Sequence, residues 1–123
     1  GKEPDANLWW FEAPANPATG EWQRHRVVTT WSLNNLDAAD FDGDGDIDLV
    51  TCEHKGTELR LLLYANDGRG RFTEHVLDRG KESHLGTLAA DLDGDGDLDL
   101  ASIAKAGEGG PGALSYNYIC ILI

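Results

Sequence analysis

Residues 38–49 have the sequence AADFDGDGDIDL, and residues 89–100 repeat it as AADLDGDGDLDL. This repeated stretch decides the fold. Ten of the twelve positions are identical, and the two differences exchange one apolar residue for another. A second, weaker match pairs GEWQRH at residues 20–25 with GRFTEH at residues 70–75. The offsets of 51 and 50 residues indicate a tandem repeat with a single period.

Each repeat is predicted to be all-β, because short apolar or alternating runs flank the acidic stretch and no helical period is present. A turn signal at residues 66–70 separates two of these runs. Residues 36–77 supply four predicted strands, residues 7–28 supply two, and the chain from residue 85 onward supplies two or three. This amounts to about two and a half four-stranded blades of a β-propeller. For residues 104–123 the sequence leaves open whether a further strand forms.

The acidic loops at residues 40–48 and 91–99 are predicted to bind calcium. Asp at positions 1, 3 and 5 turns three carboxylates toward one point, and glycines between them let the backbone wrap around it. The carbonyl at position 7 and the Asp at position 9 close the cage. Hard oxygen ligands without His or Cys favour Ca²⁺ over zinc and over magnesium. The residues assigned to the two Ca²⁺ sites are Asp40, Asp42, Asp44, Asp46 and Asp48, and Asp91, Asp93, Asp95, Asp97 and Asp99.

Two other interpretations of these loops, an ion-free turn and an EF-hand, fit the sequence less well. A solvated acidic turn without an ion would place five like charges within nine residues, which disfavours the folded loop. An EF-hand also begins Asp-x-Asp-x-Asp-Gly, but it needs a Glu at position 12 and a helix on each side. Position 12 is Thr51 in one copy and Ser102 in the other, and both flanks are β-like, so an EF-hand is excluded.

The charge of the chain is concentrated in these loops. Asp and Glu number 22 against 10 Lys and Arg, giving a formal net charge of −12. Local acidity of this kind points to cations and argues against a nucleic-acid partner. No apolar run is long enough for a membrane span, and residues 1–7 lack the apolar core of a signal peptide. Cys52 and Cys120 could form one disulfide or remain thiols.

The repeated loop resembles the calcium loop of the FG-GAP or VCBS repeat family, Asp-x-Asp-Gly-Asp-Gly-x-x-Asp-Leu, and both copies match it in full. The turn at residues 66–68 followed by Phe72 is also similar to that family, and the resemblance covers residues 7–103. It implies an integrin-α-like, seven-bladed β-propeller with structural calcium, of which residues 1–123 would be a part. Such a part is expected to need further blades or self-association. The resemblance also implies an extracellular, cell-surface or periplasmic setting.

Aromatic residues and histidines complete the inventory. Trp22 and its repeat equivalent Phe72 are predicted to be core residues. Trp9 and Trp10 are adjacent on a strand and face opposite ways, so one of them is expected to be exposed or to pack against a neighbouring blade. The four histidines do not assemble a nucleophile, base and orienting group from sequence, so no catalytic residue is predicted.

The sequence therefore predicts a calcium-stabilised, non-enzymatic recognition scaffold. Family members include adhesion subunits, fungal lectins and accessory domains of secreted carbohydrate-active enzymes, so a carbohydrate or a protein partner is the expected ligand. An accessory part of a secreted polysaccharide-active enzyme and a purely structural repeat array are the alternatives. Exposed aromatics repeating from blade to blade would favour a lectin, and an acid pair or a histidine cluster would favour an enzyme.

Overall fold

The computed structural model describes residues 4, 6–80, 82–105 and 117–122. The described part of the chain forms three antiparallel sheets and contains no helix that could cross a membrane. Sheet one pairs β1 (Ala6–Glu12) with β2 (Gln23–Thr30). Sheet two has the order β3 (Leu33–Ala39), β4 (Asp48–Glu53), β5 (Leu61–Asn66) and β6 (Phe72–Asp78). Sheet three has the order β7 (Glu82–Ala90), β8 (Asp99–Lys105) and β9 (Asn117–Leu122).

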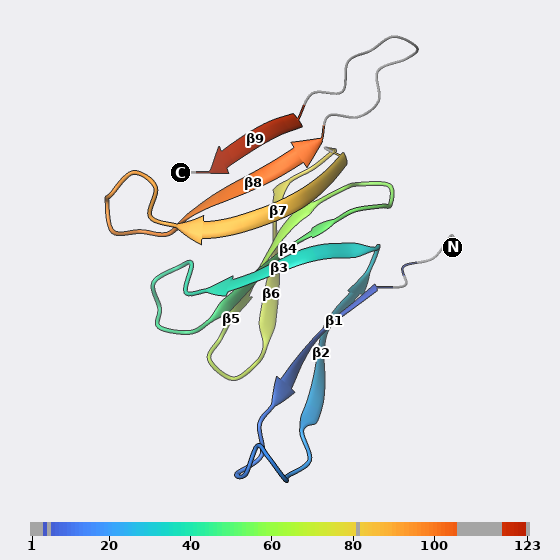
Figure 1. The fold of residues 1–123 in the computed structure, drawn as a ribbon, viewed down its shortest axis with the longest axis vertical. Coiled ribbons are helices and arrows are strands. Elements are labelled where there is room, and N and C mark those ends of the chain that lie inside the picture. The colour runs from blue at the N-terminus through green and yellow to red at the C-terminus, as the bar shows by residue number, and fades with distance from the viewer. Residues whose placement is uncertain (1–3, 5, 81, 106–116, 123) are drawn as a thin grey trace.

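The sheets lie one after another along the molecule, with β3 of sheet two against β7 of sheet three (Figure 1). Strands consecutive in sequence pair within each sheet, so turns, the acidic loops and the longer β1–β2 connection make all the connections within a sheet that lie in the described residues. The all-β prediction and the expected two and four strands of the first two sheets are confirmed. The three sheets do not close into a ring in the part of the chain that the structure describes.

The core consists of two apolar clusters, one on each face of sheet two. Leu61 and Leu62 are adjacent on β5, so their side chains point to opposite faces of the sheet. Both are nevertheless 0% exposed, because each face is covered. Leu61 packs with Val50, Cys52 and Leu100 toward sheet three, whereas Leu62 packs with Leu8 and Tyr64 toward sheet one. Burial of each leucine contributes about 1.5–3 kcal/mol. The middle sheet is therefore held from both sides.

A β-bulge recurs at the same place in two sheets. In sheet one the register shifts between Leu8 and Trp9, and in sheet two it shifts between Leu61 and Leu62. After the shift, Trp10 pairs with His25 and Leu63 pairs with His75. The β1–β2 pair is thus the structural equivalent of the β5–β6 pair. This agrees with the tandem repeat seen in the sequence.

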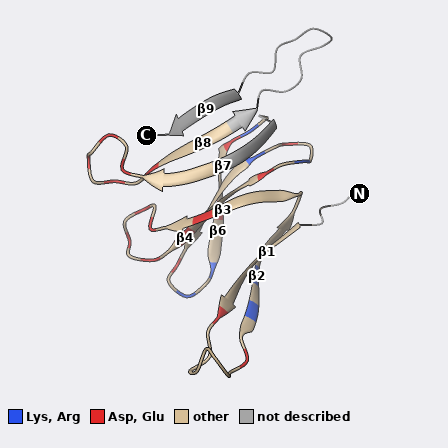
Figure 2. Cartoon of the chain, in the orientation of Figure 1, with Lys and Arg blue, Asp and Glu red and all other residues tan. Residues whose placement is uncertain are grey.

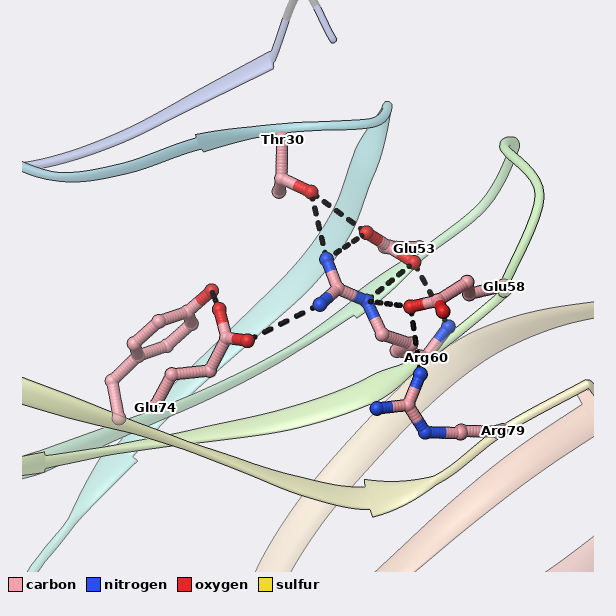
Figure 3. Close-up of polar contacts among 7 residues, drawn as sticks. Thr30, Glu53, Glu58, Arg60, Glu74 and Arg79 are labelled. Carbon is pink, nitrogen blue, oxygen red and sulfur yellow. Dashed lines mark hydrogen bonds and ion pairs between the residues drawn. The ribbon is translucent and has the colours of Figure 1, made fainter.

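A buried ionic cluster ties sheet one to sheet two (Figure 3). Glu53 at the end of β4 is fully buried, and the Arg60 guanidinium donates to both of its oxygens, at 2.7 Å from Nη2 and 3.1 Å from Nε. Thr30, the last residue of β2, donates its hydroxyl to Glu53 at 2.7 Å. Arg60 also donates a hydrogen bond to Glu74, which accepts another from the Tyr64 hydroxyl. The end of sheet one is therefore fastened by charge-assisted hydrogen bonds.

Three details differ from the sequence predictions or lie beyond them. Trp22 is 47% exposed and outside the core, because the long β1–β2 connection places it before β2 begins; its Nε1 donates to Pro17 O. Strand β5 begins only at Leu61, after Leu59, which has a φ of 49° and cannot be extended, although the apolar run predicts a strand from Leu59 to Tyr64. The Cys52 thiol is buried and donates to Asn34 O, and the side chain of Cys120 lies outside the described residues.

Candidate functional site: two acidic loops and a groove

Loop 1, residues 40–48, connects β3 to β4 and gathers carboxylates. Asp40, Asp42 and Asp48 each offer one oxygen, and these atoms lie within 4.8 Å of one another. Asp40 shapes the loop from within, because its two oxygens accept from Gly43 N at 2.8 Å and from Gly45 N at 2.9 Å. Both glycines have positive φ, 76° and 94°, a conformation that an L side chain would strain. The repeated glycines are therefore what allows the chain to turn around the triad.

The other two predicted ligands of loop 1 lie outside this triad. Asp44 Oδ1 accepts from Asp46 N at 2.8 Å, and Asp44 N donates to Asp42 Oδ1 at 3.1 Å. The Asp46 carboxylate lies against the β5–β6 turn, where a methyl group added to Gly68 would be 2.5 Å from its Oδ2. The structure thus brings together three of the four predicted side-chain ligands, and places Asp44 and Asp46, the latter predicted to bind through its carbonyl, beside them.

Loop 2, residues 91–99, repeats this geometry between β7 and β8. Its triad is Asp91, Asp93 and Asp99, again within 4.8 Å. The internal hydrogen bonds of loop 1 recur at equivalent positions, with donor–acceptor distances of 2.7 to 3.1 Å; they run from Gly94 and Gly96 to Asp91, from Asp95 to Asp93, and from Asp97 to Asp95. The near-identical sequences therefore fold into near-identical loops.

The last aspartate of each loop is its buried member. Asp48 is 1% exposed and Asp99 is 6% exposed. Asp48 Oδ2 accepts from Phe41 N at 2.9 Å, as Asp99 Oδ2 accepts from Leu92 N at 2.7 Å. Asp48 Oδ1 also accepts from Asn66 N at 2.8 Å, a contact that sequence reasoning missed. Asn66 was recognisable only as part of a turn, and its partner is 18 residues away in the chain.

The loops carry a local excess of negative charge. Figure 2 shows their acidic residues on one side of the molecule, at the β3–β4 and β7–β8 connections. The hydrogen bond from Asp44 N lowers the pKa of Asp42, but desolvation and the charges of Asp44 and Asp48 raise it by more, so the net pKa is above the usual range. None of the ion pairs among the described residues involves either loop. A cation fits this charge balance and this set of hard oxygen donors.

A groove of about 540 Å³ adjoins loop 1. One wall is β1, and the other is the β5–β6 turn together with the end of the loop; the lining is Trp10, Glu12, Ile47, Leu49, Asn66, Gly68, Arg69, Gly70 and Phe72. A methyl group on Gly70 would lie 2.4 Å from Trp10 Cζ2, so only glycine lets the indole approach the turn. This volume is in the range of small-molecule sites.

The two adjacent tryptophans have different surroundings, as the strand alternation predicts. Trp10 faces the groove and stacks on His25, with ring centroids 4.2 Å apart and an angle of 17° between the rings. His25 Nε2 lies 3.0 Å from Glu12 Oε2, so the ring and the carboxylate are held together beside the groove. Trp9 instead lies beneath the guanidinium of Arg24, at 4.3 Å, with Arg26 at 5.9 Å. Of the two expected outcomes, exposure or packing against a neighbouring blade, Trp10 fits the second, because its indole lies against Gly70 of sheet two.

These features define a class of tandem-repeat, all-β proteins with an acidic loop in each unit. The sequence profile described as FG-GAP-like repeat matches residues 40–102, from the first loop into the strand after the second. That match spans half of the chain, and the protein belongs to this family. Comparisons with the curated proteins and with the solved structures found no match.

Proposed function

We propose that the chain is a calcium-binding segment of a β-propeller that serves as a non-enzymatic recognition scaffold. The observation that carries the proposal is the pair of equivalent carboxylate triads, Asp40, Asp42 and Asp48 in loop 1 and Asp91, Asp93 and Asp99 in loop 2. Membership of the FG-GAP-like repeat family supports the same interpretation, in which sheet two is one four-stranded blade between two partial ones.

The three side chains of each triad would hold the ion, with Asp44 and Asp95 as further carboxylates and the carbonyls of Asp46 and Asp97 completing the set. All of these donors are hard oxygens, and the loops are open enough for the high and flexible coordination number of calcium. When bound, the ion would supply positive charge and no bond-breaking chemistry. The residues of the loop would then hold the end of β3 to the start of β4.

A setting outside the cytosol follows from the expected affinity. Extracellular calcium modules have dissociation constants on the order of 10⁻⁴ to 10⁻³ M, which only millimolar calcium fills. Each loop draws its carboxylates from a single connection and leaves part of them exposed to solvent, as expected of such weak sites. We therefore propose an extracellular, cell-surface or periplasmic location.

Carbohydrate is the ligand class that the groove favours. A sugar ring has an apolar face and an edge of hydroxyl groups that both donate and accept hydrogen bonds. The groove offers the Trp10 indole and Phe72 for the face, the Glu12 carboxylate as an acceptor and the Arg69 guanidinium as a donor for the edge. The His25 contact at 3.0 Å limits the freedom of Glu12 and so lowers the entropy cost of binding.

The metal part of the proposal is tested by calorimetric titration of the chelator-treated protein with calcium. We expect two bound ions, one in the variant Asp40→Asn and one in the variant Asp91→Asn. Magnesium serves as the control ion and should bind more weakly. A single ion in the unmodified protein, or two in either variant, would contradict the assignment.

The ligand part is tested with a panel of immobilised glycans and with the matched variants Trp10→Ala and Trp9→Ala. Binding of a saccharide that Trp10→Ala abolishes and Trp9→Ala retains would place the sugar in the groove. Equal loss in both variants would contradict that location. Capture of a protein ligand through Trp10, with no glycan bound, would assign the groove to the protein-partner alternative.

A further inference from the structure

The two walls of the groove differ in how they are supported. Trp10 and Glu12 stand on β1, whose register with β2 is continuous from Trp9 to Glu12. The opposite wall is the connection between β5 and β6, and its exposed tip carries Arg69. A turn of this kind opens locally more readily than a paired strand. The shape of the groove therefore depends on what holds residues 66–70.

Asn66 is the residue that holds this turn to loop 1. Its side-chain Oδ1 accepts from Gly68 N and from Gly70 N, both at 3.1 Å, and so closes the turn from inside. Its Nδ2 donates to Ile47 O at 3.0 Å, and its backbone N donates to Asp48 Oδ1 at 2.8 Å. One asparagine thus connects the groove wall to the loop by two hydrogen bonds and organises the wall with two more.

Asp48 belongs to the acid triad as well as to this connection. Its carboxylate is buried, and one of its oxygens lies within 4.8 Å of those of Asp40 and Asp42. Three carboxylates this close repel one another unless a cation balances them, so the position that Asp48 prefers depends on the ionic state of loop 1. Asp46 adds a second contact, since its carboxylate lies against Gly68.

Loop 2 provides an internal comparison. It has the same triad and the same internal hydrogen bonds, but none of residues 91–99 lines the groove. In the described part of the chain, the hydrogen bonds of loop 2 stay within the loop. Filling loop 2 would therefore stabilise sheet three without acting on the groove wall.

We propose that Asp48 and Asn66 couple loop 1 to the groove, so that a divalent cation in loop 1 orders the Arg69 wall and tightens ligand binding there, while loop 2 has no such effect. The inference rests on the proposed function for the nature of the ligand and the ion. The coupling itself is a property of the protein alone. Asn66 acts in it as a positioning residue, because it does not need to touch the ligand.

Hydrogen exchange of the amides of residues 68–71 tests the coupling without any saccharide. Calcium should slow their exchange about tenfold, the factor that corresponds to one charge-assisted hydrogen bond. The slowing should persist in Asp91→Asn, which disables loop 2, and disappear in Asp40→Asn, which disables loop 1 without removing a contact to the turn. Equal slowing in both variants would overturn the proposal.

A second variant keeps the test decisive if Asp40→Asn folds poorly. Asn66→Ala retains the backbone N–H that donates to Asp48 but loses the side chain that organises the turn. We expect calorimetry to show loop 1 still binding calcium, while residues 68–71 exchange rapidly with and without the ion. If these amides still respond to calcium in Asn66→Ala, the proposal is wrong. Failure of every glycan to bind would refute the proposed ligand and leave these exchange results unaffected.

Discussion

Strand β4 has a buried carboxylate at each end, and the two ends are neutralised in different ways. Glu53 is enclosed by the Arg60 guanidinium and the Thr30 hydroxyl, so the chain supplies its counter-charge (Figure 3). Asp48 accepts from backbone N–H groups and has two further carboxylates within 4.8 Å. Burial by itself raises the pKa of Glu53, but the hydrogen bonds from Arg60 and Thr30 lower it to below the usual range, whereas the pKa of Asp42 in the triad is raised.

The difference shows at which end of β4 the chain itself supplies the counter-charge of a buried carboxylate and at which end it does not. At the Glu53 end, opposite charges are already paired and the sheets are joined. At the Asp48 end, like charges meet and the backbone amides satisfy only part of the acceptor capacity. One strand thus separates a cluster whose counter-charge the chain supplies from the site at which we propose that a cation binds.

The largest expected effect is the loss of the counter-charge at the Glu53 end. Arg60→Ala would leave a fully buried carboxylate without its cation, which should lower the free energy of unfolding by about 3–5 kcal/mol. Urea denaturation measures this change. Arg79→Ala is the matched control, since Arg79 pairs with Glu58 on the surface and should cost less than about 1 kcal/mol. Similar losses in both variants would mean that the cluster does not behave as a buried one.

For each loop, binding of the proposed calcium ion should have the next largest effect. At a calcium concentration 100 times the dissociation constant, each loop should stabilise the folded state by about 2.7 kcal/mol. Melting curves with calcium and with chelator measure the gain. Asp40→Asn and Asp91→Asn should each lose about half of it. An unchanged melting temperature in the presence of calcium would show that no cation stabilises the Asp48 end.

The two buried aspartates should differ when calcium is absent. Asp48→Ala deprives both Phe41 N and Asn66 N of an acceptor, while Asp99→Ala deprives Leu92 N in the described contacts. The first substitution should therefore cost about 1.5 kcal/mol more, the contribution of one hydrogen bond to a charged group. Urea denaturation in the presence of chelator measures the loss in free energy of unfolding for both variants. Equal losses would show that the hydrogen bond from Asn66 N to Asp48 does not contribute to stability.

The smallest expected effect is a pH dependence of opposite sign at the two ends. Because the folded pKa of Glu53 lies below its ordinary value of 4.5, its contribution to stability is present above pH 4.5 and is lost as the pH falls through the folded pKa. The raised pKa of Asp42 works the other way, so acid should relieve the calcium-free loop. Glu53→Gln should flatten the acid limb of the stability curve measured in chelator. An unchanged limb would assign it to other carboxylates.

Local patterns in the sequence predicted the loops and the sheets well. Asp at every second position, with Gly between the middle three, predicts a tight turn within nine residues, and both loops adopt one. The apolar and alternating runs, with the turn at residues 66–70, predicted the four strands of sheet two. Local rules suffice where the interacting groups are neighbours in the chain.

Side-chain contacts between segments distant in the chain could not be read from the sequence in this way. Glu53 and Thr30 are 23 residues apart, and Asp48 and Asn66 are 18 apart, so nothing local pairs them. Trp22 shows the converse error, because its match to Phe72 predicted a shared position in the core. A longer turn in its own copy moved it out of the strand. Equivalent positions in two repeats can therefore hold similar residues in different structural surroundings.

The recurring bulge has a historical meaning. Its extra residue is Val27 on β2, opposite Leu8 and Trp9, in one sheet and Leu77 on β6, opposite Leu61 and Leu62, in the next. An extra residue at an equivalent point is inherited more simply than it is acquired twice. The irregularity therefore predates the duplication that produced the two units, and the side chains that now distinguish them, Trp10 with its groove among them, diverged on a backbone that was already bent.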